Sequence, residues 1–221
     1  MEKAHSNDGS YSSYWIVILV FLIFQYSNLY MMNVSLFSSQ IGKLFWGTFA
    51  EVAETIIVVC LLRSDLKKDW RQFTTNKLRI LEIILIGIIA LVAWNLIRNN
   101  IFPMTQNAND HAISDLYSQY PVIALILGSI VAPVVEELVF RKSMLQLFIP
   151  LFHSKIIAVI FSSLLFGLAH WNFTQASLFN QAEILGVVLR TGIGIIFACV
   201  YLKSKSIYST MIMHALWNFL D

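Results

Sequence analysis

Apolar runs long enough to cross a bilayer, which takes about 20 helical residues, recur along nearly the whole sequence. Of the 221 residues, 57% are hydrophobic and only 13% are charged. An average soluble domain is roughly a quarter charged, so this composition excludes an ordinary soluble protein. The runs also leave no stretch of the ~50 residues that the smallest usual soluble domain needs. The sequence therefore predicts one integral membrane domain of the all-α class.

Seven apolar runs are expected to form transmembrane helices, which makes the predicted fold a polytopic membrane helix bundle. They are residues 14–30, 42–62, 80–97, 120–149, 155–171, 183–202 and 207–220. No small-x-small cleavage site follows the first run, so we expect a retained span rather than a signal peptide. The last run is short for a full crossing of the bilayer. Pro133 is expected to bend the fourth helix, which should end before Pro150.

The distribution of charge between the runs predicts the orientation of the chain. The segment 63–79 holds six basic residues against Asp65 and Asp69, which marks it as cytoplasmic. The segment 98–119 contains Asp110 and Asp115 and few basic residues, and we expect an external loop there. The prediction is a multi-pass cell-membrane protein with a cytoplasmic N-terminus and an external C-terminus. The formal net charge of +2 gives no basic face for nucleic acid.

Two adjacent carboxylates and an arginine interrupt the fourth run: Glu136, Glu137 and Arg141. A charge at the centre of a bilayer costs about 2.5–3.5 kcal/mol on insertion scales, so three of them indicate a function. Glu137 and Arg141 share a helix face and are expected to neutralise each other. Glu136 is turned about 100° away, toward a cavity, and is the candidate general base. A purely structural network of the three charges is the alternative.

The fourth and fifth runs should form an antiparallel hairpin that turns near residues 151–154. Glu136 lies 16 residues before Phe152 and His170 lies 18 residues after it. At ~1.5 Å per residue, the two side chains should lie within about 3 Å of the same height. His214 and Asn218 share a face of the last helix. Three helices can thus direct these groups at one cavity, although each polar group alone could simply bond a neighbouring helix.

These side chains are the groups that a hydrolase needs. A carboxylate and an imidazole at one height can hold a water or a divalent metal ion and take a proton from the water. A second histidine and an amide can donate hydrogen bonds to a developing oxyanion. The sequence contains neither a Gly-x-Ser-x-Gly motif nor a His-Glu-x-x-His motif. A serine hydrolase of the α/β type and a zincin-type metalloprotease therefore find no support.

Three motifs occur in order on successive apolar runs: Glu136-Glu137-x-x-x-Arg141, Phe166-x-x-x-His170 and His214-x-x-x-Asn218. This ordered set resembles the signature of the CPBP family, the CAAX prenyl endopeptidase and bacteriocin-processing (Abi) intramembrane proteases. The resemblance covers the chain from about Pro121 to Leu220. Within the single membrane domain we therefore distinguish residues 1–119, N-terminal helices that match the family poorly, from residues 120–221, the protease core.

The resemblance implies an active site in an intramembrane cavity that cleaves peptide bonds near the membrane. It assigns water activation to Glu136, help in holding the water to His170, and oxyanion stabilisation to His214 with Asn218. It also implies that the neighbouring Glu137 and Arg141 shape the site.

Members of the family are commonly classed as metalloproteases, and a metal-free glutamate mechanism is also argued for them. If a divalent metal ion binds, the expected ligands are Glu136, His170 and His214, a set that suits zinc. The implied partners are the lipid bilayer and a membrane-associated peptide or protein substrate. Eukaryotic relatives trim prenylated CAAX proteins, whereas bacterial relatives are linked to bacteriocin self-immunity and peptide processing. This compact chain resembles the bacterial members.

Two other functions remain open at the level of sequence. A non-enzymatic immunity or partner-binding membrane protein could keep the fold without using the site. A transporter could use Glu51, Glu54, Glu136 and Arg190 along an ion path, although the sequence shows no inverted repeat. Arg190 could pair with Glu137 or Glu51, extend toward a membrane interface, or contact a substrate carboxylate, and of these we expect a structural ion pair. Glu51 and Glu54 either line the interior of the bundle or bond locally.

Overall fold

The computed structural model describes residues 8–33, 39–102, 106–171 and 180–220, and these residues form helices and short connections without any strand. The helices are α1 (Asp8–Asn33), α2 (Gln40–Leu61), α3 (Arg63–Thr75), α4 (Lys77–Ile101), α5 (Ala108–Gln119), α6 (Pro121–Ile126), η2 (Leu127–Val131), α7 (Ala132–Glu136), η3 (Glu137–Met144), α8 (Leu145–Phe152), α9 (Lys155–Leu168), α10 (Gln181–Ser204) and α11 (Ile207–Leu220). The all-α fold class predicted from the sequence is confirmed.

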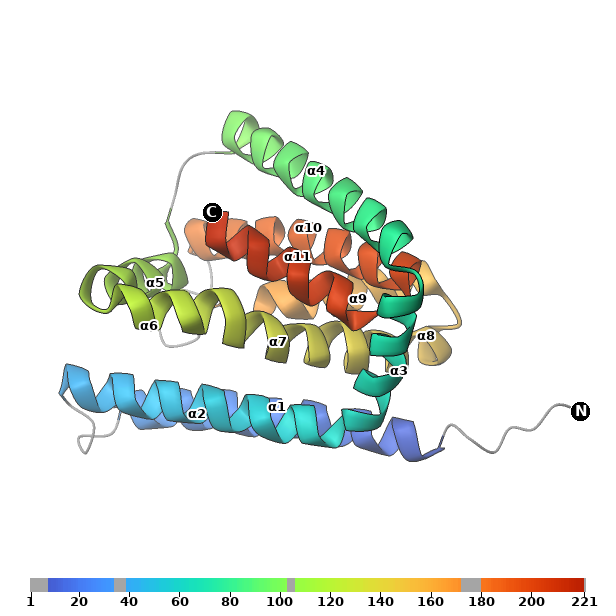
Figure 1. Ribbon diagram of the computed structural model, residues 1–221. Coiled ribbons are helices and arrows are strands. Elements are labelled where there is room, and N and C mark those ends of the chain that lie inside the picture. The colour runs from blue at the N-terminus through green and yellow to red at the C-terminus, as the bar shows by residue number, and fades with distance from the viewer. Residues whose placement is uncertain (1–7, 34–38, 103–105, 172–179, 221) are drawn as a thin grey trace, which may run out of the picture.

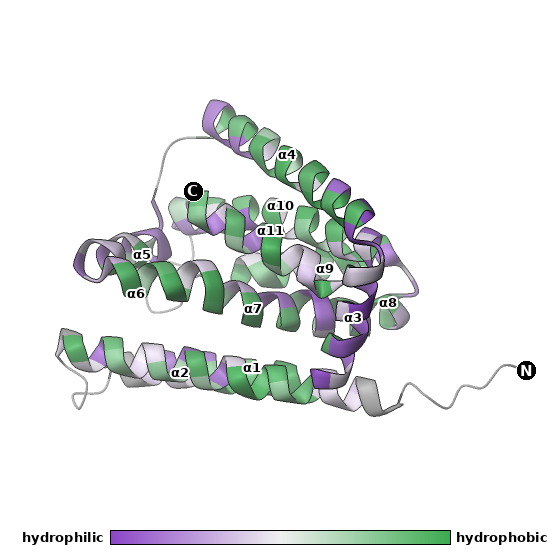
Figure 2. Cartoon of the chain, in the orientation of Figure 1, coloured by the Kyte–Doolittle hydropathy of each residue, from purple (hydrophilic) through white to green (hydrophobic). Residues whose placement is uncertain are grey.

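A helix occupies each of the seven predicted spans. Within the described residues, four helical segments are long and apolar enough to cross a membrane: Ile41–Leu61, Lys77–Ile101, Pro121–Phe152 and Gln181–Ser204. Polar residues gather in α3 at one end of the bundle and in α5 at the other, with mostly apolar helices between them (Figure 2). The protein is therefore a multi-pass membrane helix bundle. Its predicted orientation is untested, and residues 1–7 and 221 at its ends lie outside the described part.

The segment Pro121–Phe152 runs through the middle of the bundle (Figure 1). The antiparallel pair α1 and α2 packs on one side of it, and α9, α10 and α11 pack on the other. α4 covers α10 and α11 from outside. The connection after α8 turns at His153, whose φ of 51° is left-handed, and Ser154 then caps α9 by accepting from the Ile157 N–H. The predicted hairpin of the fourth and fifth spans is confirmed.

The central segment differs from the predicted fourth span in two respects. It contains two π-helical stretches, η2 before Pro133 and η3 after Glu136, where the sequence predicted only a bend at Pro133. It also continues past Pro150 to Phe152, so the prediction that the helix ends before Pro150 is wrong. A proline removes only its own N–H from the helix, and α8 ends two residues later in any case.

The two polar segments at the ends of the bundle are helices. The basic segment after α2 forms α3, which crosses one end of the bundle from α2 to α4 (Figure 1). The predicted external loop contains α5, so its description as a loop is wrong. The missed signal is a capping box: the Asn107 side chain accepts from the Asp110 N–H, and the Asp110 side chain accepts from the Asn107 N–H.

Arg190 pairs with Asp110, with 2.6 Å between Nη2 and Oδ1. The predicted structural ion pair is confirmed, but its partner is neither Glu137 nor Glu51. Glu183, also on α10, accepts from the Ala108 N–H at 2.8 Å. These two contacts attach the start of α5 to α10. The sequence could not give this partner, because Asp110 and Arg190 lie on different helices and are 80 residues apart.

Helices α9 and α10 approach each other closely at Gly167. A Cβ atom added there would lie 2.6 Å from the Val187 carbonyl oxygen and 2.7 Å from the Thr191 Oγ1. Small residues at such crossings let helix backbones pack closely inside membranes. Because one obstacle is a backbone atom, it cannot move aside without shifting α10.

We expect Gly167→Ala to lower the thermal unfolding temperature of the purified protein, because forcing a methyl group into packed structure costs about 1–3 kcal/mol. The matched control is Gly47→Ala on α2, where an added Cβ meets nothing within 4 Å. The control should unfold at or above the wild-type temperature, since alanine is the better helix former. Equal unfolding temperatures for the two variants would show that this crossing is not tightly packed.

Candidate active site

Glu136 ends α7 and lies between the two histidines that the sequence singled out. Its Oε1 is 3.6 Å from the His170 Nε2, and its Oε2 is 3.7 Å from the His214 Nε2. The side chain of Glu136 is 18% exposed, so it is accessible without being on the open surface. The predicted proximity of Glu136 and His170 across the α8–α9 hairpin is therefore confirmed. Side chains from α7, α11 and the end of α9 meet at one carboxylate.

Both imidazole rings are oriented by a bond at the other ring nitrogen. His170 Nδ1 lies 2.9 Å from the Phe166 carbonyl oxygen, and His214 Nδ1 lies 2.9 Å from the Glu137 Oε1. A carbonyl oxygen and a carboxylate oxygen accept, so each Nδ1 carries the proton that it donates. In the neutral rings, each Nε2 therefore presents a lone pair toward Glu136.

Glu137 and Arg141 form the buried ion pair that their i,i+4 spacing predicts. Arg141 Nη1 is 3.0 Å from the Glu137 Oε1, and the two side chains are 1% and 0% exposed. Arg141 also donates from Nη2 to the Gly194 carbonyl oxygen at 3.4 Å. Glu137 thus neutralises Arg141 and accepts from His214 at the same oxygen. It links η3 to α11, which positions the His214 ring beside Glu136.

Aromatic rings surround this polar cluster. The guanidinium carbon of Arg141 lies 4.3 Å from the centroid of Phe166 and 5.1 Å from that of Phe197, distances typical of cation–π contacts. Phe197 packs on the His214 ring with 4.4 Å between centroids, and Phe166 contacts the His170 ring edge-on at 5.0 Å. The rings form an apolar wall on the buried side of the site. This low-polarity wall strengthens the electrostatic interactions among the charged groups.

Asn218 bonds to the backbone of the central segment. Its Nδ2 donates to the Gly128 carbonyl oxygen at 2.9 Å. In η2 the Ala132 N–H bonds five residues back, to the Leu127 carbonyl oxygen. The next N–H in that pattern would serve Gly128, but residue 133 is a proline and has none. Asn218 supplies the missing donor and joins α11 to η2.

Glu136 and the two histidines beside it are side chains of the types that bind divalent metal ions. Both histidines offer a neutral Nε2, and both donate the N–H of the other ring nitrogen to an oxygen, as metal-bound histidines usually do. Among the described residues, however, no group of three or more His, Cys, Asp or Glu side chains is spaced to hold a metal ion. Small movements of Glu136, His170 and His214 would be needed to close such a site.

Other residues that the sequence singled out lie near the site or away from it. Glu54 on α2 is buried at 3% exposure, so this carboxylate lies in the interior of the bundle. Glu51 on the same helix is half-buried, and α2 packs against α7, which ends at Glu136. Arg190 is held by Asp110 instead. Sequence reasoning missed Phe197 and Gly194, because an aromatic residue and a glycine in an apolar run carry no signal of a site.

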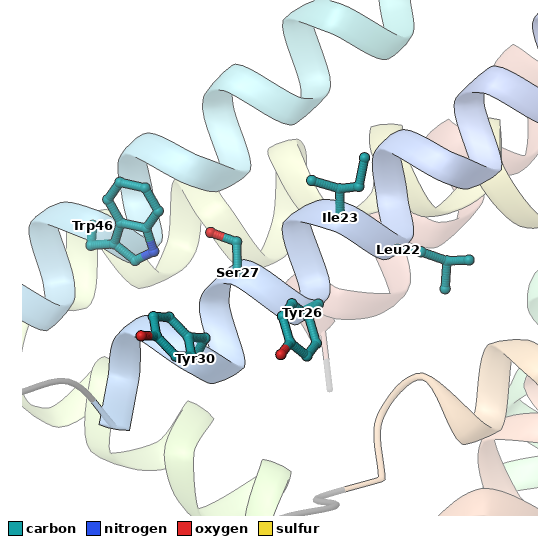
Figure 3. Close-up of a pocket in the computed structure, with 6 residues that line it drawn as sticks. All are labelled: Leu22, Ile23, Tyr26, Ser27, Tyr30 and Trp46. Carbon is teal, nitrogen blue, oxygen red and sulfur yellow. The ribbon is translucent and has the colours of Figure 1, made fainter.

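Two surface grooves lie away from Glu136. The larger, of about 460 Å³, is formed by α1 and α2 and lined by Leu22, Ile23, Tyr26, Ser27, Tyr30 and Trp46 (Figure 3). The second lies on one face of α2, from Phe45 to Ile56. Their linings are almost entirely apolar, as expected where a helix faces lipid. Neither groove is lined by a residue of the three motifs.

Residues 118–220 match the family model described as type II CAAX prenyl endopeptidase Rce1-like. The chain is 27% identical over 224 aligned positions to a protein of Bacillus subtilis (strain 168) named "Putative membrane peptidase YdiL". That alignment covers 93% of this chain and 86% of the relative. No solved structure matches the chain. The matched residues include every member of the three motifs, and the resemblance to the CPBP family of membrane proteases is confirmed over residues 118–220.

Proposed function

We propose that this protein is an intramembrane endopeptidase that hydrolyses peptide bonds of membrane-associated proteins or peptides. The observation that carries the proposal is the Glu136 carboxylate, which two imidazole Nε2 atoms approach to 3.6 Å and 3.7 Å inside a membrane helix bundle. The family match over residues 118–220 and the name of the Bacillus subtilis relative, a membrane peptidase, support it. A transporter or a protein that only binds a partner would not need a carboxylate arranged in this way.

In the proposed reaction Glu136 acts first as a general base. A water that hydrogen-bonds to Glu136 and to the lone pair of His170 Nε2 is held in place and loses a proton to the carboxylate as it attacks the scissile carbonyl. The carbonyl carbon becomes tetrahedral, and its oxygen gains negative charge. Glu136 then returns the proton to the leaving amine as the C–N bond breaks. The oxyanion re-forms the carbonyl as the amine leaves, so the products are a carboxylic acid and an amine, and Glu136 is again a carboxylate.

Stabilisation of the oxyanion is assigned to His214 and Asn218. An amide nitrogen carries two N–H donors, and the bond from Asn218 to Gly128 uses one of them. His214 can donate from Nε2 only when the ring is doubly protonated, because its Nδ1 proton is engaged by Glu137. In its neutral form the same Nε2 is instead a ligand for a cation. The protonation of His214 therefore separates a metal-free mechanism from a metal-assisted one.

If a metal ion is used, we propose that Glu136, His170 and His214 hold it. A divalent ion there would polarise the scissile carbonyl and lower the pKa of a bound water. The buried pair of Glu137 and Arg141 would keep its role, since it orients His214 in either case.

We expect Glu136→Gln to abolish cleavage of membrane-associated peptides while the protein remains inserted and folded, because the amide is nearly isosteric but cannot take a proton. The loss should reach the 10²- to 10⁴-fold that general base catalysis typically contributes. The measurement is mass spectrometry of peptides incubated with purified protein in lipid. Glu82→Gln, an exposed carboxylate on α4, is the matched control and should cleave like the wild type. Undiminished cleavage by Glu136→Gln would exclude the mechanism.

We expect Glu137→Gln and Arg141→Ala to lower the yield of folded protein as well as activity. Each change leaves its partner as an uncompensated charge in a fully buried position, which typically costs about 3–5 kcal/mol. Size-exclusion chromatography and thermal unfolding of the purified variants measure this. The contrast is with Glu136→Gln, which should lose activity at normal yield. Normal folding of both variants with normal cleavage would show that the pair is dispensable.

A chelator distinguishes the two forms of the mechanism. If Glu136, His170 and His214 bind an essential metal ion, removing it should abolish cleavage, and adding zinc should restore it. Activity that persists in the chelator, with no metal detected by elemental analysis of the active protein, would establish the metal-free form. The Glu136→Gln variant is inactive under both alternatives, so it controls for contaminating proteases.

A further inference from the structure

Asp69 is a buried carboxylate in the part of the chain that the family model does not cover. It lies on α3, outside the four candidate spans, and is 6% exposed. Its Oδ1 is 2.8 Å from the Nζ of Lys142, and its Oδ2 accepts from the Ile207 N–H at 3.0 Å. Its backbone oxygen accepts from the Ser206 hydroxyl at 3.0 Å. One residue of α3 therefore bonds to both η3 and the start of α11.

The bond to Ile207 caps α11 from another helix. Ile207 is the first residue of α11, where backbone N–H groups have no partner within the helix. A carboxylate satisfies one of them and also interacts favourably with the positive end of the helix dipole. A second bond, from the Gln72 side chain to the Ser204 carbonyl oxygen at 3.3 Å, joins α3 to the residues just before α11. The contact of Trp70 with Tyr208, at 5.1 Å between ring centroids, lies at the same junction.

The bond to Lys142 attaches Asp69 to η3, the stretch that also contains Glu137 and Arg141. Lys142 follows Arg141 directly in η3 and is six residues from Glu136. His214 is seven residues from Ile207, which is about two helical turns along α11. Asp69 thus bonds the two elements whose side chains meet in the contact between Glu137 and His214. Moving either element along its axis would alter that contact and the distance from His214 to Glu136.

The electrostatics of Asp69 agree with this double role. Burial raises the pKa of the Asp69 carboxyl above its ordinary value, while Lys142 and the Ile207 N–H act to lower it. The two bonds therefore favour the charged form of the Asp69 carboxylate and oppose the effect of burial. Lys142 is itself 7% exposed, so the pair shields both charges from the apolar surroundings.

We propose that Asp69 is a positioning residue of the peptidase site: by bonding Lys142 on η3 and the first N–H of α11 together, it sets the place of the His214 ring beside Glu136. This inference rests on the proposed function, and it assigns to α3 a part in catalysis although α3 contributes no group to the reaction. Asp69 acts through other residues and does not contact the substrate.

The test uses the full-length protein in lipid and the double variant Asp69→Asn/Lys142→Met. The asparagine oxygen can still accept from Ile207, and removal of the lysine avoids a buried unpaired charge, so the variant should fold. The tie between α3 and η3 is lost, together with the contact of the Lys142 Nζ over the Tyr201 ring at 6.0 Å. The matched control is Asp65→Asn, because Asp65 lies one turn earlier on α3 and is also 6% exposed. Its ion pair, with Lys68 at 3.8 Å, stays within α3.

Two properties are measured for each variant, at a temperature where its unfolding curve shows that it is fully folded. The first is peptide cleavage, where we expect kcat to fall roughly 10- to 100-fold in the double variant with KM unchanged, since misplacement by about 1 Å can have effects of this size. The second is the NMR spectrum of protein labelled with ¹⁵N in its histidine rings. The signals of His214 are identified as those absent from the spectrum of the His214→Gln variant. These signals should move in the double variant and stay in place in Asp65→Asn.

Each outcome decides the proposal. Wild-type kcat and unmoved His214 signals in the double variant would overturn it, and so would an equal loss of kcat in Asp65→Asn. If the wild-type protein cleaves no peptide, the result counts against the proposed function. The His214 signals would still show whether Asp69 affects the position of the His214 ring. In that case, signals that move only in the double variant support the role of Asp69 in placing this ring.

Discussion

The buried carboxylate of Glu137 is the interaction on which the arrangement of the site depends. A charge inside an apolar bundle must be paired, and Glu137 is paired on two sides, with Arg141 in its own helix and with His214 on α11. The first bond neutralises it, and the second joins two helices that are distant in the sequence. Because the same oxygen serves both, the position of the His214 ring is tied to that of η3. Arg141 pairs with Glu137, and Glu136 instead faces the imidazole rings of His170 and His214.

Irregular helix in the central segment supports this geometry. The π-helical stretches η2 and η3 flank Glu136 on both sides. Such stretches often occur at functional sites, because they leave backbone groups without their usual partners and redirect side chains. Here the backbone oxygen freed by Pro133 is bonded by Asn218, a member of the last motif. Asn218 therefore helps to hold the segment that carries Glu136, whatever it also contributes to the reaction.

The sequence allowed the residues of the site to be predicted, but not most of the contacts that hold them in place. Burial of charge in apolar helices made Glu136, Glu137 and Arg141 conspicuous, and helix rise placed His170 level with Glu136, which the 3.6 Å contact confirms. Spacing could not predict the π-helical stretches, because the positions of apolar residues do not show where the backbone bonds change from four residues back to five. Nor could it predict that Asp110 pairs with Arg190, since the two residues lie on different helices, 80 residues apart in the sequence. Phe197 has the same appearance in the sequence as any other residue of an apolar span.

The N-terminal helices also take part in building the site, although the family match begins only at residue 118. Phe21 on α1 packs edge-on against Phe140 of η3, with 5.4 Å between ring centroids. Glu54 on α2 is buried, and α2 packs against α7, which ends at Glu136. The six polar residues of the three motifs can be recognised in the sequence by their types and spacing, whereas the helices that enclose them supply apolar surface and a few bonds. The part of the chain that the family model does not match therefore still contributes to the surroundings of Glu136.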